Sequence, residues 1–282
     1  MAKVYTVNSI SPVVQMPPAV VSHETDDEIM NRLRRRFGIL EDMTQAVKAG
    51  GVRGLIVTGA AGVGKSWGVE KVLGRYDSFA NIAQDNKLKQ YEIIKGEISA
   101  LHLFVKLHEY KDEKSVVVFD DCDIWGDENC VQLMKAALDT SKARSINWNK
   151  DSNLLKSEGI DNSFEFKGGV IFITNVNFDN VRSKKMRDHL TALESRCHFL
   201  DLTIGSEREV MLRIRQVIGD GMLDKYNFDD EVVREIIDFV DVNKKKLREF
   251  SLRTVIKAAD LKKSFGHNWQ NYATETLIDR FK

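Results

Sequence analysis

Five short apolar runs, bounded by glycine or polar residues, are the clearest pattern along this chain. They lie at 54–58, 91–95, 115–121, 168–175 and 198–202. Strands that are buried on both faces have such near-continuous hydrophobic runs. Segments with apolar residues at helical spacing separate them, at 28–48, 67–73, 100–110, 126–141 and 181–195. Strands alternating with helices predict an α/β fold with a five-stranded parallel sheet and helices on both faces.

The pattern changes near Ile204. Beyond Gly205 the apolar residues recur only at helical spacing, which predicts four helices and a separate all-helical domain. We therefore expect an N-terminal extension at 1–28, an αβα domain at 29–203 and a helical domain at 204–282.

Two further segments do not fit the alternation of strands and helices. Residues 143–148 and 163–166 alternate apolar and polar positions around a polar tip, which predicts a β-hairpin with a long loop. The extension holds three prolines and the acidic run 24–28, and it fits a flexible arm or an edge strand. Residues 95–99 are expected to form a turn.

A glycine-rich segment between the first strand and the next helix carries the strongest chemical signal. It matches G-x-x-x-x-G-K-[ST] at every fixed position, and its residues are Gly59, Ala60, Ala61, Gly62, Val63, Gly64, Lys65 and Ser66, followed by Trp67. Glycines let consecutive backbone N–H groups approach a phosphate, and the following helix N-terminus adds partial positive charge. Lys65 is expected to reach the β- and γ-phosphates, and Ser66 is expected to bind Mg²⁺. The segment predicts an ATP site that includes Trp67.

Polar residues end two of the other predicted strands. Asp120 and Asp121 follow Ser115–Phe119, and Asn175 ends the strand that begins at Gly168. Ligands bind at the carboxyl edge of parallel sheets, so these side chains are expected beside the phosphate loop. Asp120 would bind Mg²⁺, Asp121 would polarise the attacking water and Asn175 would orient it.

The composition limits the partners. Of 282 residues 43% are hydrophobic, and 42 Lys and Arg balance 42 Asp and Glu. The net charge of zero does not favour nucleic-acid binding, so a DNA site must be a local patch. Three cysteines without metal-ligand spacing and no hydrophobic signal core predict a reduced, cytoplasmic location. No apolar run is long enough to span a membrane.

Together these motifs resemble the AAA+ ATPases, a family of P-loop NTPases with an αβα core and a helical lid. The resemblance covers about residues 29–262 and implies a ring or filament in which neighbouring subunits complete each site. The loop corresponds to Walker A, Asp120 and Asp121 to Walker B, and Asn175 to sensor 1. The family usually has glutamate where this chain has Asp121.

Two arginines gain roles from the same resemblance. Arg196, in Ser195-Arg196-Cys197, resembles the arginine finger that acts on the neighbouring subunit, with Arg187 as the alternative. Arg253 resembles the sensor 2 arginine of the lid, with Arg248 as the alternative. The hairpin lies where the pre-sensor 1 hairpin lies in one AAA+ group, and uncharacterised bacteriophage AAA+ ATPases share similar motifs.

The resemblance leads to one main hypothesis and two alternatives. The main one is a phage-encoded oligomeric motor, a hexameric ring or helical filament in the host cytoplasm. It would hydrolyse ATP during DNA replication or recombination, with Lys95, Lys150 and Lys156 near DNA. The first alternative is a remodeller or loader that acts on a protein partner without binding DNA. The second is a nucleotide switch without turnover, which Asp121, Asn175 and Arg196 argue against.

Overall fold

A computed structural model describes residues 24–77, 89–124, 126–175 and 184–280. Most of the predicted N-terminal extension and the start of the predicted helix at 181–195 lie outside these residues. Within the described ranges, no helix is long and apolar enough to span a bilayer.

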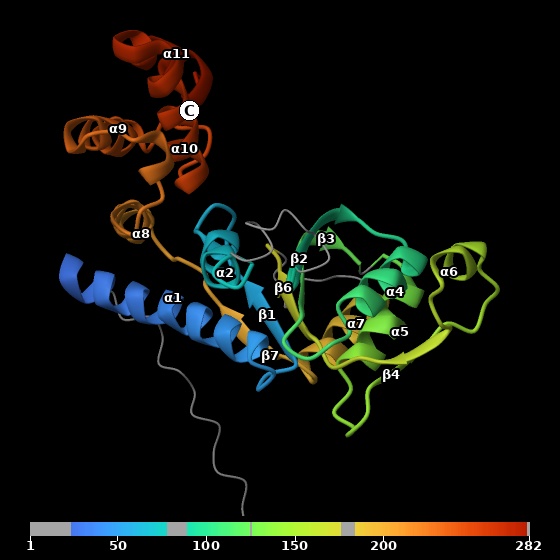
Figure 1. Cartoon of the computed structure of the whole chain (residues 1–282). Coiled ribbons are helices and arrows are strands. Elements are labelled where there is room, and N and C mark those ends of the chain that lie inside the picture. Colours follow the sequence, from blue (N-terminus) through green and yellow to red (C-terminus); the bar gives the residue numbers. More distant parts are fainter. Residues whose placement is uncertain (1–23, 78–88, 125, 176–183, 281–282) are drawn as a thin grey trace, which may run out of the picture.

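One parallel sheet organises the first domain (Figure 1). Its strands are β1 (Gly54–Thr58), β2 (Tyr91–Glu97), β3 (Val116–Asp123), β6 (Gly169–Ile173) and β7 (His198–Asp201), in the order β2-β3-β6-β1-β7. The prediction of five parallel strands is confirmed. The order puts β1 and its loop between β6 and β7, so the ends of β3 and β6 lie close to that loop.

Successive side chains of each strand face opposite layers, because the side-chain period of a strand is two. Ile56, Val117 and Phe172 pack against α4 (Ala100–Glu109), α5 (Glu128–Ala137) and α7 (Lys184–Glu194). Leu55 and Val118 pack on the other face against α1 (Asp26–Lys48) and α2 (Lys65–Leu73). Two helical layers therefore enclose the sheet, which confirms the three-layer αβα core.

Helix α1 begins inside the acidic run that the sequence left open as an arm or an edge strand. Thr25 is its N-cap, and Thr25 and Glu28 form a reciprocal capping box. Three acidic residues occupy the first turn, where they complement the partial positive charge of the helix N-terminus. The run is therefore the start of one 23-residue helix that continues to Lys48.

Two other segments differ from the prediction or add to it. The expected turn at 95–99 is wrong for its first half, because β2 continues to Glu97 past an irregularity at Gly96, whose φ is 82°. The predicted hairpin is present as β4 (Ser145–Asn147) and β5 (Ser163–Glu165), and its tip holds the short helix α6 (Asn153–Glu158).

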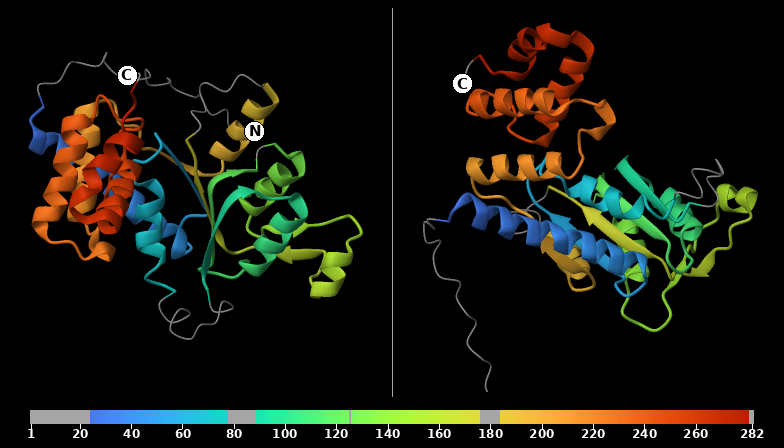
Figure 2. Two further views of the ribbon diagram at one scale, coloured as in Figure 1. Left: turned by 90° about the horizontal axis from the view of Figure 1, so that it is seen from above. Right: turned by 60° about the vertical axis from the view of Figure 1, so that its left-hand side comes forward.

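The C-terminal region is a helical lid, as predicted. It consists of α8 (Glu207–Gly219), α9 (Asp230–Asn243), α10 (Leu252–Phe265) and α11 (Trp269–Leu277), with short 3₁₀ turns at Asp224–Tyr226 and Gly266–Asn268. The lid has its own core around the fully buried Trp269. Helices α9–α11 lie above the sheet, and α8 lies beside α1 (Figures 1 and 2).

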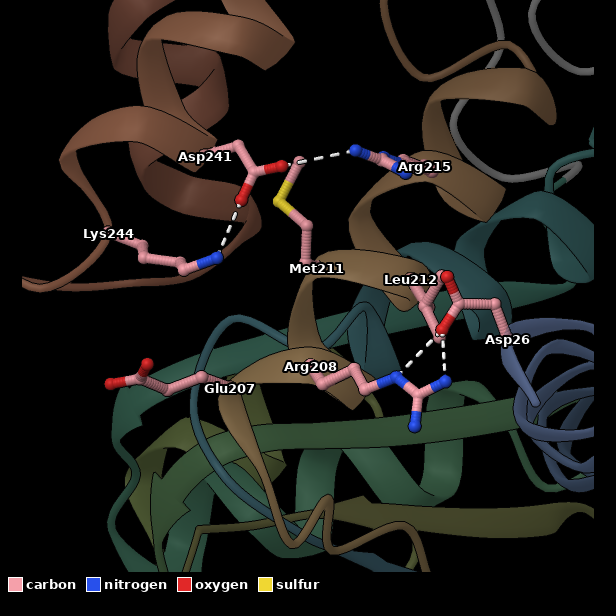
Figure 3. A pocket seen from close by; sticks show the side chains of 8 residues that line it. All are labelled: Asp26, Glu207, Arg208, Met211, Leu212, Arg215, Asp241 and Lys244. Carbon is pink, nitrogen blue, oxygen red and sulfur yellow. Dashed lines mark hydrogen bonds and ion pairs between the residues drawn. The ribbon is translucent and has the colours of Figure 1, made fainter. Parts of the chain in front are cut away.

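A charged cleft lies between α1, α8 and α9 (Figure 3). Arg208 pairs with Asp26, while Arg215 and Lys244 both pair with Asp241. These pairs are partly exposed, so each contributes no more than about 1 kcal/mol. The Arg208 and Arg215 pairs connect α8 to α1 on one side and to α9 on the other.

Candidate nucleotide-binding site

The phosphate loop connects the end of β1 to the start of α2. Gly64 is the N-cap of α2 with φ 97°, and no side chain caps this helix. The first N–H groups of α2 are therefore available to an anion. Gly59 and Gly62 also have positive φ, which residues with a side chain adopt poorly.

The loop residues named from the sequence divide into four sets. Gly62, Gly64, Lys65, Ser66 and Trp67 line a pocket at the carboxyl edge of the sheet. Val63 is buried in the core beneath the loop, and Ala60 and Ala61 are exposed. Gly59 contributes its backbone, because its carbonyl accepts a hydrogen bond from Lys65.

Lys65 lies at the centre of the pocket and is 5% exposed. Its Nζ donates to the carbonyls of Gly59 and Ala60, at 2.7 and 2.9 Å, and to Asn175 Oδ1 at 2.7 Å. Burial lowers the pKa of Lys65 to about 8, and nearby Asp121 only partly opposes that effect. The ammonium is therefore desolvated and held in place beside the loop.

Asn175 connects Lys65 to the second acidic residue of β3. Its Nδ2 donates to Asp121 Oδ2 at 2.8 Å, while its Oδ1 accepts from Lys65. The structure thus brings together three side chains that lie 54 or more positions apart in the sequence, at the start of α2, in β3 and just after β6. Asp121 is exposed and has an unusual φ of 49°.

Ser66 and Asp120 form the pair that fits a divalent cation. Ser66 Oγ donates to Asp120 Oδ1 at 2.9 Å, and Asp120 is 7% exposed. A hydroxyl and a carboxylate oxygen are suitable ligands for Mg²⁺, which usually keeps several waters and takes few protein ligands. Accordingly, the described residues contain no cluster of three or more His, Cys, Asp or Glu that would form a fully protein-coordinated metal site.

Lys95 has a position that the sequence did not indicate. Its Nζ lies 3.1 Å from Asp120 Oδ2 and 3.9 Å from Glu70 Oε1. The sheet register brings it there, because Lys95 of β2 pairs with Asp120 of β3. Lys95 is therefore a neighbour of the candidate Mg²⁺ site. The other two lysines expected near DNA, Lys150 and Lys156, are exposed near the hairpin tip.

The lid closes one side of the pocket. Arg253 lines it together with Met222, Leu252 and Ile256. The side chain of Arg253 is 53% exposed, and its Nη1 lies 3.9 Å from Glu249 Oε1. Arg248, the alternative sensor 2 residue, does not line this pocket as far as the described residues show.

Arg213 of α8 is a lid residue that sequence reasoning missed. It is 4% exposed, its Nε lies 3.4 Å from the Val63 carbonyl, and its guanidinium carbon lies 3.5 Å from the centre of the Phe37 ring. Burial lowers its pKa to about 10. Arg213 therefore joins the lid, the phosphate loop and α1. The sequence pattern of α8 offers no signal that separates a buried arginine from an exposed one.

Arg196 lies away from the pocket of its own chain. It follows α7, and its Nη1 donates to the carbonyl of Ala192 at 2.6 Å. Neither Arg196 nor the exposed Arg187 is among the described residues that line the nucleotide pocket.

Comparison with known proteins gives one strong similarity. No family model matches the chain. It is 36% identical over 254 residues to an uncharacterised 36.7 kDa protein of Enterobacteria phage T4, encoded in the nrdC-mobD intergenic region. The matched segment spans 89% of this chain and 76% of the phage protein.

Two solved structures are more distantly similar. A DNA replication initiation factor is 13% identical with a TM-score of 0.44, over 87% of this chain and 64% of its own length. Drosophila ORC bound to DNA is 15% identical with a TM-score of 0.37, over 94% of this chain and 70% of the other. The chain thus spans less than two thirds of the initiation factor.

Proposed function

Because this chain belongs to the family of the 36.7 kDa phage T4 protein and has the AAA+ fold, we propose that it is a phage-encoded ATPase. It binds ATP with Mg²⁺, hydrolyses the γ-phosphate and works as an oligomer in DNA transactions. The observation that carries this proposal is the connected set Lys65, Asn175 and Asp121 beside the Ser66–Asp120 pair.

Each of these side chains has a distinct role in phosphoryl transfer. Lys65 is cationic and desolvated, so its attraction for phosphate oxygens is strong. Ser66 and Asp120 would hold Mg²⁺, which when bound neutralises charge on the phosphates. Asp121 would accept a hydrogen bond from the attacking water, and Asn175 fixes the orientation of Asp121 through a 2.8 Å hydrogen bond.

Two arginines complete the proposal. Arg253 lines the pocket from the lid and would contact the phosphates in the same chain. Arg196 would act on the nucleotide of the adjacent subunit, which its position outside its own pocket supports. Arginine suits this role because its planar guanidinium stays charged and binds two oxygens at once.

The specific ATPase rate at increasing protein concentration, with and without single- and double-stranded DNA, tests this function. A rate that rises with concentration indicates sites formed between subunits, and a several-fold increase with DNA supports the DNA motor. A rate that rises but ignores DNA would favour the remodeller of a protein partner. No hydrolysis at any concentration, with or without DNA, would contradict the proposal.

Lys65→Ala is the companion variant, and Lys245→Ala is its control. We expect Lys65→Ala to abolish ATP binding, because it removes the only lysine among the residues lining the described pocket. Lys245 is exposed in the turn after α9, so its loss should leave binding unchanged. Isothermal titration with ATP and Mg²⁺ measures both.

A further inference from the structure

A second polar pocket lies at the edge of the sheet opposite the phosphate loop. Its lining comes from segments just before strands: Arg53 precedes β1, Lys114 precedes β3, Arg144 precedes β4 and Lys167 precedes β6. The pocket has a volume of about 470 Å³. The C-terminal end of α1 and strand β4 lie along this side of the molecule, far from α9–α11 (Figure 1).

Positive charge dominates the pocket. Its lining has five cationic side chains, Arg53, Lys114, Lys142, Arg144 and Lys167, against the two carboxylates Glu113 and Glu165. The ion pair between Lys167 and Glu165 in this lining is weak. Its Nζ–Oε2 distance is 3.9 Å, and both side chains are about half exposed. The chain as a whole is neutral, so this pocket is a local excess of cations.

Arg144 is the buried member of this set. It is 9% exposed, its Nη1 donates to the Ala137 carbonyl at 2.9 Å, and its guanidinium carbon lies 5.2 Å from the centre of the Phe166 ring. It forms no ion pair with any carboxylate of the described residues. Burial, together with repulsion from Arg53, lowers its pKa to about 10, and attraction to Glu165 opposes this only in part.

Arg53 has a similar environment. Its Nη1 donates to the carbonyl of Asp139 at 2.5 Å, so it too is bound by a backbone oxygen. Two guanidinium groups that repel one another and bond carbonyls leave their remaining N–H groups for an anion. A buried charge is costly without a partner of opposite sign, and an anion in the pocket would remove that cost.

The exposed lysines indicate a polymer with repeated negative charges. Lys114, Lys142 and Lys167 are exposed around the buried Arg144, and together they present more cations than one small anion would contact. Lysines and arginines spread over such a surface match successive phosphates of a nucleic-acid strand. The aromatic ring in the lining, Phe166, is only 1% exposed, so it offers no face for a base to stack on.

We propose that this pocket binds the phosphate backbone of a nucleic acid without sequence preference. Arg53 and Arg144 bind one phosphate, and Lys142 and Lys167 contact its neighbours. The inference rests on the DNA-binding part of the proposed function and is independent of ATP hydrolysis.

Fluorescence anisotropy with short labelled single- and double-stranded DNA, without nucleotide and over a series of salt concentrations, tests the proposal. We expect Lys142→Gln/Lys167→Gln to weaken binding about tenfold or more and to reduce the salt slope by about 0.7–0.9 for each lost phosphate contact. Both lysines are exposed, so this variant should fold normally.

Lys245→Gln/Lys246→Gln is the matched control, because it removes two exposed lysines in the turn after α9, outside the pocket. It should bind like the unmodified chain. The assignment would be overturned if both double variants lost DNA affinity equally. It would also be overturned if the pocket variant bound DNA as tightly as the unmodified chain. If the Lys65→Ala variant binds inorganic tripolyphosphate but neither DNA, the pocket takes a free polyanion and the nucleic-acid assignment is wrong.

The Lys65→Ala variant distinguishes the nucleic-acid proposal for this pocket from the ATPase proposal. It should lose ATP binding and keep its DNA affinity, since the two sites lie at opposite edges of the sheet. Intact ATPase activity without DNA binding would overturn the pocket assignment alone. DNA binding without ATPase activity would overturn the enzymatic proposal alone.

Discussion

Asp121 has a backbone conformation that few residues adopt easily. Its φ of 49° lies in the left-handed region, where aspartate and asparagine are enriched among residues other than glycine. The AAA+ resemblance leads one to expect glutamate at this position. The left-handed backbone gives a physical reason for the shorter side chain, because aspartate and asparagine can stabilise that conformation locally.

Two substitutions at Asp121 distinguish the catalytic role of its carboxylate from its fit to the left-handed backbone conformation. We expect Asp121→Asn to bind ATP with unchanged affinity and to lower kcat about 100-fold or more, because it removes the carboxylate that polarises water. Its free energy of unfolding should stay close to that of the unmodified chain. Asp121→Glu keeps the carboxylate but should lose about 1 kcal/mol in urea unfolding. Full hydrolysis by the Asn variant would refute the catalytic role.

The lowered pKa of Lys65 predicts how ATP affinity depends on pH. Below pH 8 the lysine is already protonated, so the affinity should not change with this group. Above about pH 8 most of the lysine is deprotonated, so ATP binding must be coupled to the uptake of a proton by Lys65. The association constant for ATP should therefore fall by up to tenfold per pH unit. Calorimetry in buffers of different ionisation enthalpy should show proton uptake in this range. An affinity that stays constant well above pH 8 would contradict the shift.

Sequence reasoning placed the site residues that lie in a contiguous motif or at the end of a strand. The phosphate loop, Asp120 and Asn175 are of this kind, because strand order brings strand ends together. Lys95 and Arg213 could not be placed in that way. Lys95 reaches Asp120 because the register of β2 against β3 pairs the two residues, and Arg213 is buried by contacts with Phe37 and the loop.

At the scale of elements, the phosphate loop packs directly against the start of α10. The Leu252 N–H donates to the Gly62 carbonyl at 2.9 Å, and Ser251 is the N-cap of α10. A Cβ at position 62 would lie 2.6 Å from Ser251 Cβ and Oγ. Only glycine fits here, both for its φ of 69° and for this approach.

Gly62→Ala therefore tests the packing between loop and lid. We expect it to lower the free energy of unfolding by about 2–4 kcal/mol, from backbone strain and overpacking together. It should also weaken ATP binding, because the loop must move away from α10. Urea unfolding and ATP titration measure the two effects.

Gly159→Ala is the control for strain alone. Gly159 has a nearly equal φ of 65°, but nothing lies within 4 Å of an added Cβ. Its loss of stability should be about 1 kcal/mol, with ATP binding unchanged. Equal losses in the two variants would show that contact with α10 adds nothing.

The elements themselves were predicted well where the apolar pattern was long and regular. All five strands of the sheet and the four lid helices follow such patterns. The short α6 was missed because its tip sequence is polar, although Ser152 and Gly159 supply its two caps. The acidic start of α1 was missed for a similar reason, since Thr25 and Glu28 signal a helix through capping rather than through apolar spacing.

At the scale of the whole molecule, a finger that acts between subunits predicts complementation. Arg196→Ala alone should bind ATP and lose hydrolysis, and Lys65→Ala alone should lose both. A mixture of the two should recover part of the activity, since some interfaces combine an intact loop with an intact Arg196. ATPase assays over a range of mixing ratios measure this. No recovery in mixtures shown to form joint oligomers would argue against a finger in trans.

The lid is joined to the phosphate loop at neighbouring points, Gly62 through Leu252 and Val63 through Arg213. Helix α11 lies far from these points, at the outer end of the lid (Figure 1). The contacts with the loop thus lie at one end of the lid, and α11 lies at the other end. A small tilt of α10 at the loop would therefore move the outer helices through a much larger distance.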